Sequence, residues 1–512
     1  MMLTRRSIIG AAAAAPALLT FGRAGALTPE RLFSFGVASG EPTPDGVVLW
    51  TRLASQPLAG DGGMGSARVP VRWEVYSDDQ ARHVVLAGNA VAEPAWGHSV
   101  HVEVRGLQPG RPYWFRFIAG GEASAIGRTR TAPARDAMPD RLRLCFGSCQ
   151  KYEDGQFGAW ANSVAEDPDL IFFLGDYIYE EDPSVGTPRV HLNPAPVDLA
   201  GYRVRYATYR LDPLLQAAHA IAPWIVTWDD HEVINDYADL ADQHNSDPAV
   251  MARRRAAAYQ AYYEFMPLRA FSRPHGPDLR LYRTLDWGQL AQFQILDDRQ
   301  YRSPRACQSR ARGEMSVSLV KDCPDLHDPK ASILGARQEK WLHETLTATR
   351  ARWNILAQQT QITPYPRRDP AHPDGPADMQ TVDTWQGYQA SRERLFSLWQ
   401  DAKVSNPFVI GGDIHAFVAS DIGYRGQPLA PCFVGGSITT QAGDKLLQRN
   451  IADLPEYRFA RNDVRGYGRI DVTPSQCDVA FRALRNPLDA ATQAYDLTRY
   501  VVENGRPRMQ SV

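Results

Sequence analysis

The stretch LIFFLGDYIY, residues 170–179, sets a run of apolar residues directly before a turn and two polar side chains. A short apolar run that ends at a turn signal is typical of a buried strand. We therefore predict a strand over residues 170–174, ended by Gly175, with Asp176 and Tyr179 in the turn that follows. Because Asp176 and Tyr179 are three residues apart on this turn, both side chains can reach one centre.

Three further apolar runs, at residues 141–146, 224–228 and 408–410, are also followed by polar side chains. Helical periodicity at residues 252–265 and 336–349 favours an α/β domain after residue 140. In α/β folds, ligands gather outside the carboxyl ends of strands, so these predicted strand ends can bring distant residues together. The residues that follow the three runs are, in order, Cys149; Asp229, Asp230, His231 and Glu232; and Asp413 and His415.

These residues have the chemistry of metal ligands. A phenolate oxygen, as Tyr179 can supply, suits a hard, highly charged ion such as ferric iron. Buried neighbouring carboxylates, such as Asp229 and Asp230, repel each other unless a cation or hydrogen-bond donors offset their charge. Asp413 and His415 are two residues apart, so we expect both to point to the same side of an extended backbone.

Each motif taken alone also has a structural interpretation. Asp176 can cap a helix, with Tyr179 packed beneath it. Cys149 can be a buried thiol or a disulfide partner for Cys145. The acidic residues at 229–232 can form a solvated loop, although the apolar run just before them argues against this. Taken together, the clusters favour a metal site.

The first part of the chain has a different pattern. From about residue 33 to 133, short alternating runs are broken by Gly, Pro and Asp, which indicates a β-sandwich. In the segment LQPGRPY, residues 107–113, we expect a fibronectin-type corner in which the Tyr113 hydroxyl returns to the nearby backbone. With a linker at 129–140, we predict a β-sandwich unit at residues 27–135 and a second unit at 136–512, which holds the four clusters of ligand-type residues.

Residues 1–26 read as an export signal. Arg5 and Arg6 precede an alanine-rich apolar run, and small residues at 24–26 offer a cleavage site. The run is shorter than the roughly 20 residues that span a bilayer, and Arg23 interrupts it, which disfavours the alternative of a helical anchor. The paired arginines resemble the twin-arginine signal, which exports folded proteins and suits one that acquires its metal in the cytoplasm. We expect the twin-arginine export machinery as a partner, and a periplasmic or secreted mature protein without a transmembrane anchor.

Composition excludes some partners and allows disulfides. The chain has 56 Lys and Arg residues against 58 Asp and Glu residues, so no basic excess points to a nucleic-acid surface.

An oxidising compartment permits disulfides, and Cys307 and Cys323, which bracket a loop-like stretch, are the best candidate pair. The sequence does not settle Cys432 and Cys477.

The order of the clusters resembles the metallophosphoesterase superfamily, and closely its alkaline phosphatase D (PhoD) branch. The segments FGVASG at 35–40, VLWTR at 48–52, DDRQYR at 297–302 and residues 353–359 also resemble that family, so the likeness covers nearly all of the mature chain. The implied fold is α/β. It consists of an amino-terminal fibronectin- or Ig-like β-sandwich followed by a calcineurin-like sandwich of β-sheets flanked by helices.

The resemblance also implies a set of metal ligands. Asp176 would bridge from the iron to calcium, and Asn235 and Asp236 could add to the calcium shell. One departure is Gln386, at a position where the family often has Asp, which puts one calcium contact in doubt. The implied ligands are Cys149, Asp176, Tyr179 and His415 for Fe³⁺, and Asp230 and Asp413 for Ca²⁺.

The implied activity is that of a secreted metal-dependent phosphoesterase. It would hydrolyse small-molecule phosphomonoesters and phosphodiesters through a metal-bound hydroxide or oxide. The implied catalytic residues are Asp230 and His231, the latter as a proton donor or electrostatic stabiliser, or else as a residue that orients a ligand. Two alternatives stay open: a phosphodiesterase or phospholipase D-like enzyme with the same centre, and a non-catalytic cell-surface binding protein.

Overall fold

The computed structural model describes residues 32–244, 246–308 and 319–512. The predicted export signal, residues 1–26 with Arg5 and Arg6, lies outside these residues. Within the described part of the chain, no helix combines the length and the apolar character needed to cross a membrane.

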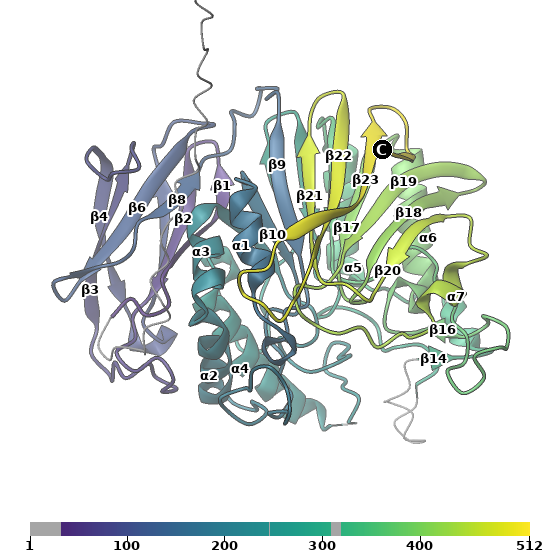
Figure 1. Ribbon diagram of the computed structural model, residues 1–512, viewed down its shortest axis with the longest axis horizontal. Helices are drawn as coiled ribbons and strands as arrows, with labels where there is room; N and C mark the ends of the chain where they lie inside the picture. Colours follow the sequence, from purple (N-terminus) through teal and green to yellow (C-terminus); the bar gives the residue numbers. More distant parts are fainter. Residues whose placement is uncertain (1–31, 245, 309–318) are drawn as a thin grey trace, which may run out of the picture.

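Two mixed sheets form the centre of the molecule (Figure 1). In the larger one, the predicted strands are present as β9, β10 and β11, and they are parallel neighbours. Its order is β24 (Met509–Ser511), β23 (Ala494–Glu503), β22 (Gln476–Leu484), β21 (Gly466–Val472), β9 (Leu142–Gly147), β10 (Leu170–Leu174), β11 (Pro223–Thr227), β1 (Val37–Thr43), β2 (Gly46–Arg52) and β5 (Ser99–Arg105).

The predicted strand at 408–410 belongs to the second sheet, as β17. Strands β13, β15, β17 and β19 are parallel neighbours there, and the other strands pair antiparallel to them or to each other. The order is β12 (Arg283–Trp287), β13 (Ala291–Ile295), β15 (Trp353–Ala357), β17 (Pro407–Gly411), β19 (Gln427–Gly435), β18 (Phe417–Tyr424) and β20 (Tyr457–Arg461). A separate short pair joins β14 (Leu319–Val320) to β16 (Gln380–Thr381).

The two sheets pack face to face. Strand β10 is covered on both of its faces, which explains why all of its residues are apolar. Phe172 packs into the core between the sheets, where its ring lies 4.6 Å from that of Phe293 in β13. Ile171 and Phe173 point the other way, into the core beneath the helices. Because side chains alternate along a strand, one covered on both faces must be apolar at every position.

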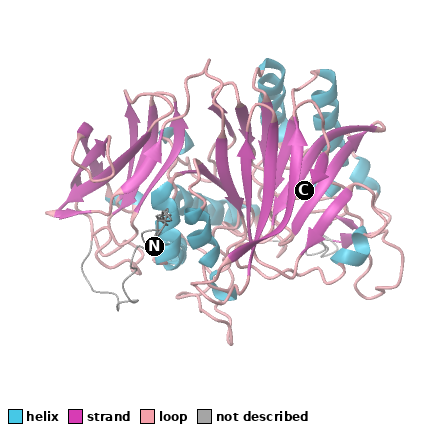
Figure 2. Ribbon diagram, turned by 45° about the horizontal axis from the view of Figure 1, so that its top comes forward, coloured by secondary structure: helices cyan, strands magenta, loops and turns pink. Residues whose placement is uncertain are grey.

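Helices cover the outer faces of the sheets (Figure 2). Helices α2, α3 and α4 each begin after an aspartate whose carboxylate accepts a backbone N–H of the first turn. The α-helices are α1 (Gly158–Ala165), α2 (Leu199–Arg210), α3 (Pro213–Ile221), α4 (Pro248–Phe265), α5 (Gly335–Ala348), α6 (Gln389–Asp401) and α7 (Leu447–Ile451). The described 3₁₀ helices are η1 (Pro94–Trp96), η2 (Tyr152–Asp154), η3 (Ala270–Ser272), η6 (Pro324–His327) and η7 (Trp385–Gly387).

The amino-terminal strands form a layer at one end of the molecule (Figure 1). The predicted corner is confirmed, because the Tyr113 hydroxyl accepts a hydrogen bond from the backbone N–H of Gln108 at 2.9 Å. The sheet of this layer packs on β1, β2 and β5, which are part of the ten-stranded sheet. It comprises β4 (Val84–Ala92), β3 (Val69–Tyr76), β6 (Pro112–Ala119), β7 (Glu122–Ala123) and β8 (Gly127–Arg130).

The described part of the predicted amino-terminal unit, residues 32–135, shares a sheet with the rest of the chain. Strand β1 pairs in parallel with β11, so the second layer of the expected sandwich continues into the large sheet. The sequence does not reveal this, because a strand's partner across a sheet leaves no local signal. The predicted disulfide between Cys307 and Cys323 is present, whereas Cys145, Cys149, Cys432 and Cys477 are free and buried.

Candidate metal centre

The candidate ligands meet at one edge of the two facing sheets. Cys149 follows β9, Asp176 and Tyr179 follow β10, and Asp413 and His415 follow β17. Four of these residues have a left-handed backbone, with φ of 58° at Cys149, 59° at Asp176, 67° at Asp413 and 52° at His415. Such conformations are uncommon outside glycine and cluster at functional sites, where the surrounding structure holds them.

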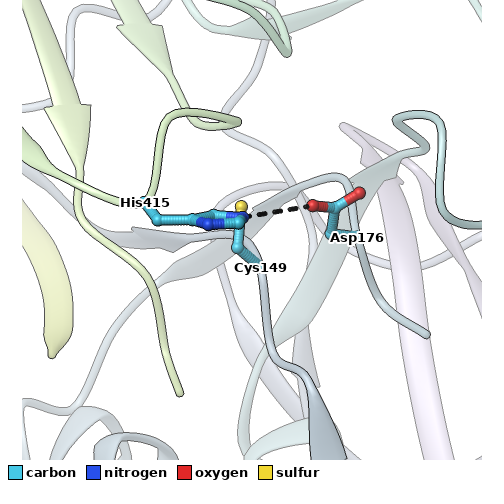
Figure 3. A group of neighbouring side chains, drawn as sticks. All are labelled: Cys149, Asp176 and His415. Carbon is cyan, nitrogen blue, oxygen red and sulfur yellow. Dashed lines mark ion pairs between the residues drawn. The ribbon is translucent and has the colours of Figure 1, made fainter. Parts of the chain in front are cut away.

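Cys149, Asp176 and His415 form the first ligand group (Figure 3). One potential ligand atom from each lies within 4.8 Å of the others. Tyr179 joins them, because its hydroxyl donates to Asp176 Oδ2 at 2.8 Å and lies 3.2 Å from His415 Nε2. The fold thus brings together a thiol, a carboxylate, a phenol and an imidazole that follow the ends of three different strands.

The backbone around Asp413 and His415 differs from the prediction. We expected an extended segment with both side chains on one side, but both residues have positive φ and the chain turns sharply. His415 Nε2 faces Asp176 Oδ2 at 3.8 Å, whereas Asp413 Oδ1 faces the Arg299 guanidinium at 3.3 Å. The two-residue alternation of a strand does not apply once the strand has ended.

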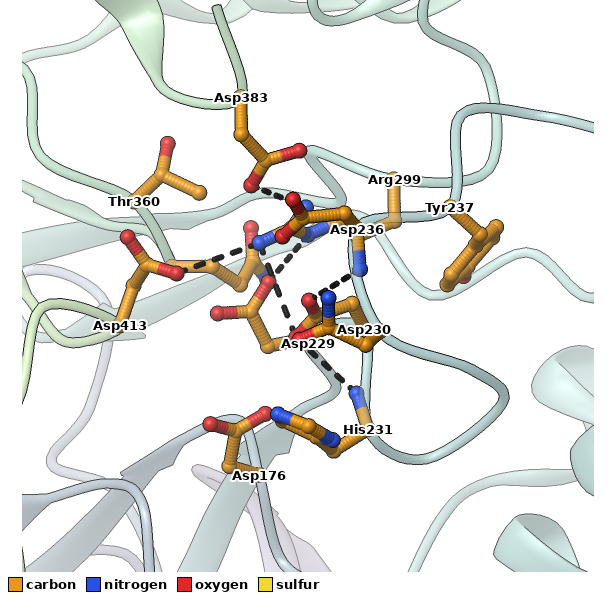
Figure 4. Close-up of polar contacts among 12 residues, drawn as sticks. Asp176, Asp229, Asp230, His231, Asp236, Tyr237, Arg299, Thr360, Asp383 and Asp413 are labelled. Atoms are coloured by element: carbon orange, nitrogen blue, oxygen red, sulfur yellow. Dashed lines mark hydrogen bonds and ion pairs between the residues drawn. The ribbon is translucent and has the colours of Figure 1, made fainter. Parts of the chain in front are cut away.

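Beside this group, carboxylates surround the buried guanidinium of Arg299 (Figure 4). Arg299 contacts Asp229, lies 2.7 Å from Asp383 and lies 3.8 Å from Asp230. Burial and the neighbouring negative charges raise the pKa of Asp413 well above its usual range, although Arg299 opposes the shift. Burial likewise raises the pKa of Asp230 to about 6. This region holds more carboxylates than its arginines offset.

Two further ligand groups lie among these carboxylates. Asp230, Asp236 and Asp383 have oxygens within 4.8 Å of one another, and so do ligand atoms of Asp176, Asp230 and His231. Asp176 and Asp230 thus link the three groups into one continuous centre. Asp383 is a candidate that the sequence motifs did not single out.

The residues of the acidic cluster at 229–232 have different contacts and therefore different roles. His231 Nδ1 lies 2.7 Å from Glu180 Oε2, and its ring lies 4.1 Å from that of Tyr179. Burial lowers the pKa of His231, but Glu180, Asp230 and Asp176 outweigh this and raise it well above its usual value. Glu180 thus fixes Nδ1 of His231, and the surrounding carboxylates favour the protonated ring.

Glu232, by contrast, stabilises the local backbone. Its carboxylate accepts the backbone N–H groups of Asp176, Tyr177 and Asp229 at 3.1, 2.6 and 2.8 Å. It thereby joins the turns after β10 and β11, and it belongs to none of the three ligand groups of the described residues.

Gln386, the departure noted in the sequence, lies in a different environment. Its amide bonds to Gln380, and its Oε1 accepts a hydrogen bond from Arg392 at 3.1 Å. From this segment, the side chain of Asp383 is the one that lies among the carboxylates around Arg299.

The donor set fits bound cations. The buried Oδ1 of Asp176 and Oδ2 of Asp229 have no hydrogen-bond partner among the described residues. Buried carboxylate oxygens without a donor are costly unless a cation contacts them. A thiol, an imidazole and a phenol suit a transition metal, and the carboxylates of Asp230, Asp236 and Asp383 suit a hard divalent cation.

A cavity of about 410 Å³ opens beside the centre. Asp383, Asp413 and His415 are among the residues that line it, together with Gln361 and Tyr365. A small molecule in this cavity can therefore reach the ligand groups.

The chain is similar to proteins of one known family. Residues 144–481 match the family model described as PhoD-like phosphatase, and residues 21–133 match that of the PhoD-like phosphatase amino-terminal domain. Alkaline phosphatase D of Bacillus subtilis (strain 168) is 41% identical over 470 residues, which cover 88% of this chain and 77% of the relative. A solved structure titled "Structure of PhoD" has a TM-score of 0.87 and 38% identity, covering 95% of this chain and 93% of that one. The chain, an α/β protein with ligand-type residues gathered at its strand ends, thus belongs to the PhoD-like phosphatase family.

Proposed function

We propose that this protein is an exported, metal-dependent phosphoesterase that hydrolyses phosphomonoesters and phosphodiesters. The observation that carries the proposal is the joining of three ligand groups through Asp176 and Asp230, next to a cavity that admits a small molecule. Family membership supports phosphate esters as the substrates.

We assign Fe³⁺ to Cys149, Asp176, Tyr179 and His415, because phenolate and thiolate together suit a highly charged transition metal. Ca²⁺ is assigned to the carboxylates, whose hard oxygens it prefers. The calcium ligands would be Asp230, Asp236 and Asp383, which form one ligand group, with Asp176 shared with the iron group. Asp413, which belongs to none of the described ligand groups and faces Arg299 at 3.3 Å, would complete the shell. When bound, such cations neutralise phosphate oxygens and activate water at neutral pH.

The residues of the chain supply positioning and a proton. In this proposal His231 acts through a proton on Nε2 and not as a metal ligand: Glu180 fixes its Nδ1 at 2.7 Å, and Nε2 carries the proton that the leaving alcohol needs. Glu180 Oε1 also accepts the backbone N–H of Asn235 at 2.8 Å, which keeps the carboxylate in place. Arg299 balances part of the carboxylate charge and holds Asp229 and Asp383 in position.

The candidate ligands and His231 all lie within residues 136–512, so we propose that this part carries catalysis. In the described part of the amino-terminal unit, β3, β4, β6, β7 and β8 form a fibronectin-like layer that packs on β1, β2 and β5 of the large sheet, and the catalytic part has a calcineurin-like arrangement of two sheets between helices. The amino-terminal unit supplies none of the described ligand groups, which argues against the alternative of a binding protein whose amino-terminal layer alone is functional.

One comparison of rates tests the activity. Purified enzyme would be assayed in parallel on a phosphomonoester, a bis-ester and a phospholipid. We expect hydrolysis of the first two; a rate on the phospholipid alone would favour the phospholipase D-like alternative. Absence of hydrolysis in protein shown to contain metal would refute the proposed function.

Export through the twin-arginine route to the periplasm or medium is tested separately. We expect Arg5→Lys with Arg6→Lys to leave precursor inside the cell, because the receptor reads the arginine pair. Unimpaired export of this double variant would indicate the general secretory route instead.

A further inference from the structure

We infer that this protein has a second oxyanion site, outside the metal centre, in which the buried guanidinium of Arg392 binds a small anion of the phosphate type. The inference goes beyond the proposed function, because it assigns a ligand to a different cavity. This second cavity shares no lining residue with the cavity beside the metal centre, and none of its lining residues belongs to the described ligand groups.

The second cavity has a volume of about 620 Å³, which is ample for a phosphate-sized ion. Four arginines line it, and they come from separate parts of the chain. Arg392 belongs to α6, Arg425 to the turn between β18 and β19, Arg458 to β20, and Arg508 to the segment just before β24. The fold therefore gathers positive charge at one hollow that no single stretch of sequence reveals.

Arg392 is a buried cation without an acidic partner. It is 8% exposed, and within the described part of the chain its guanidinium makes no ion pair and one hydrogen bond, from Nη1 to Gln386 Oε1 at 3.1 Å. Burial lowers the pKa of Arg392, but an arginine stays protonated in proteins. Because a buried charge is costly unless it is paired, Arg392 lacks a counter-charge that an anion would supply.

The guanidinium of Arg392 is accessible from the cavity. Its Nε and Nη2 make no hydrogen bond with the described residues, yet neither is among their fully buried atoms without a partner. These two donors therefore keep contact with the cavity that Arg392 lines. Nε and Nη2 lie side by side on one edge of the guanidinium, the edge that can bind two oxygens of an oxyanion in parallel.

The other arginines of the cavity differ in how far their charge is offset. Arg458 pairs with Asp421 at 2.8 Å, and Asp421 also accepts the backbone N–H of Met509 at 3.1 Å. Arg425 and Arg508, by contrast, make no ion pair with the described residues, and Arg425 lies over the ring of Tyr424. Their charges remain available to attract an anion to the cavity.

Two further carboxylates, Glu393 and Glu456, also line the cavity but do not pair with Arg392. Glu393 is exposed and follows Arg392 directly in α6, and adjacent residues of a helix do not face each other. It favours the charged form of Arg392 from a distance without contacting it. Arg392 therefore keeps two donors that no carboxylate of the described residues occupies.

Gln386 is the residue that leaves Arg392 without a counter-charge. Its neutral amide oxygen accepts the hydrogen bond from Nη1, where a carboxylate at the same distance would form an ion pair. A bound oxyanion would supply the negative charge that residue 386 does not carry. A glutamate at this position should therefore compete with the anion for Arg392.

The test counts the phosphate sites of the metal-loaded enzyme by equilibrium dialysis with labelled inorganic phosphate. We expect two sites in the parent, one at the metal centre and one at Arg392. Arg392→Gln should keep the first and weaken the second about ten- to hundred-fold, the effect of losing hydrogen bonds to a charged group. The matched control Arg337→Gln, at an exposed position of α5, should keep both sites.

Gln386→Glu provides a second variant in which Arg392 stays in place. The new carboxylate should pair with Arg392 and weaken the same site, so this variant decides the question if Arg392→Gln does not fold. A parent site that survives at full affinity in every folded variant is not the one inferred, and if all parent sites do so the inference is wrong. A single parent site that both variants lose would support the Arg392 site while counting against phosphate binding at the metal centre.

Discussion

The contact between Glu180 and His231 offers a sharp test of the proton donor. In Glu180→Gln the side chain keeps its size and an oxygen for the Asn235 N–H, but it loses the charge that faces His231 Nδ1 at 2.7 Å. Glu180 is one of the groups that raise the pKa of His231, so its neutralisation lowers that pKa. His231 then loses its proton at a lower pH than in the parent.

The size of the effect follows from the type of contact. A hydrogen bond to a charged group contributes about 1.5–3 kcal/mol. One pKa unit corresponds to about 1.4 kcal/mol, so the pKa of His231 should fall by roughly one to two units. At a pH above both pKa values, the protonated fraction of His231, and with it kcat, should therefore be about ten- to hundred-fold lower in the variant than in the parent.

The assay is the pH dependence of kcat on a phosphomonoester, with iron and calcium contents measured in each sample. We expect the descending limb at high pH to move to lower pH in Glu180→Gln. Glu181→Gln is the matched control, since Glu181 is 47% exposed and pairs with Lys151 instead. Profiles that superimpose for the parent and Glu180→Gln would refute a proton-donating role of His231.

Two further predictions concern calcium and acid stability. Removing calcium with a chelator should abolish activity, and adding calcium should restore it. The reason is that Asp230 and Asp413 need a cation to stay charged together. Full activity in a sample shown to be calcium-free would contradict the assignment of these two residues to calcium. His219 is buried against Trp224, and burial lowers its pKa well below the usual value of 6.5. Below that pH the unfolded chain binds a proton that the folded protein does not, so the free energy of unfolding should fall by up to about 1.4 kcal/mol per pH unit. Denaturant unfolding of the parent and His219→Phe should show this difference below pH 6.5 and lose it above; parallel curves would contradict it.

The sequence predicted those parts of the site that follow apolar strands. Cys149, Asp176 and the residues after β11 come directly after buried runs, and parallel neighbouring strands end at the same edge of a sheet. Tyr113 was predictable because a tyrosine corner is a local motif whose partner, Gln108, lies only a few residues away.

The parts that the sequence did not reveal depend on contacts between distant residues. Asp383 follows no long apolar run, and it reaches Arg299 only through the fold. Glu180 stands next to Tyr179, but its partner His231 lies in the turn after another strand. The positive φ at Asp413 is likewise a feature of the folded backbone, which no alternation of residue types encodes.

The most direct test of the metal assignment is the visible absorption spectrum of the purified enzyme. A phenolate bound to ferric iron gives a charge-transfer band, so the parent should look violet or blue. Tyr179→Phe removes the hydroxyl that lies 2.8 Å from Asp176 but keeps the ring packed against His231, so the fold should persist while colour and activity fall. A folded, iron-loaded variant as coloured as the parent would show that Tyr179 is not the ligand, and a colourless, active parent with zinc would contradict the ferric assignment itself.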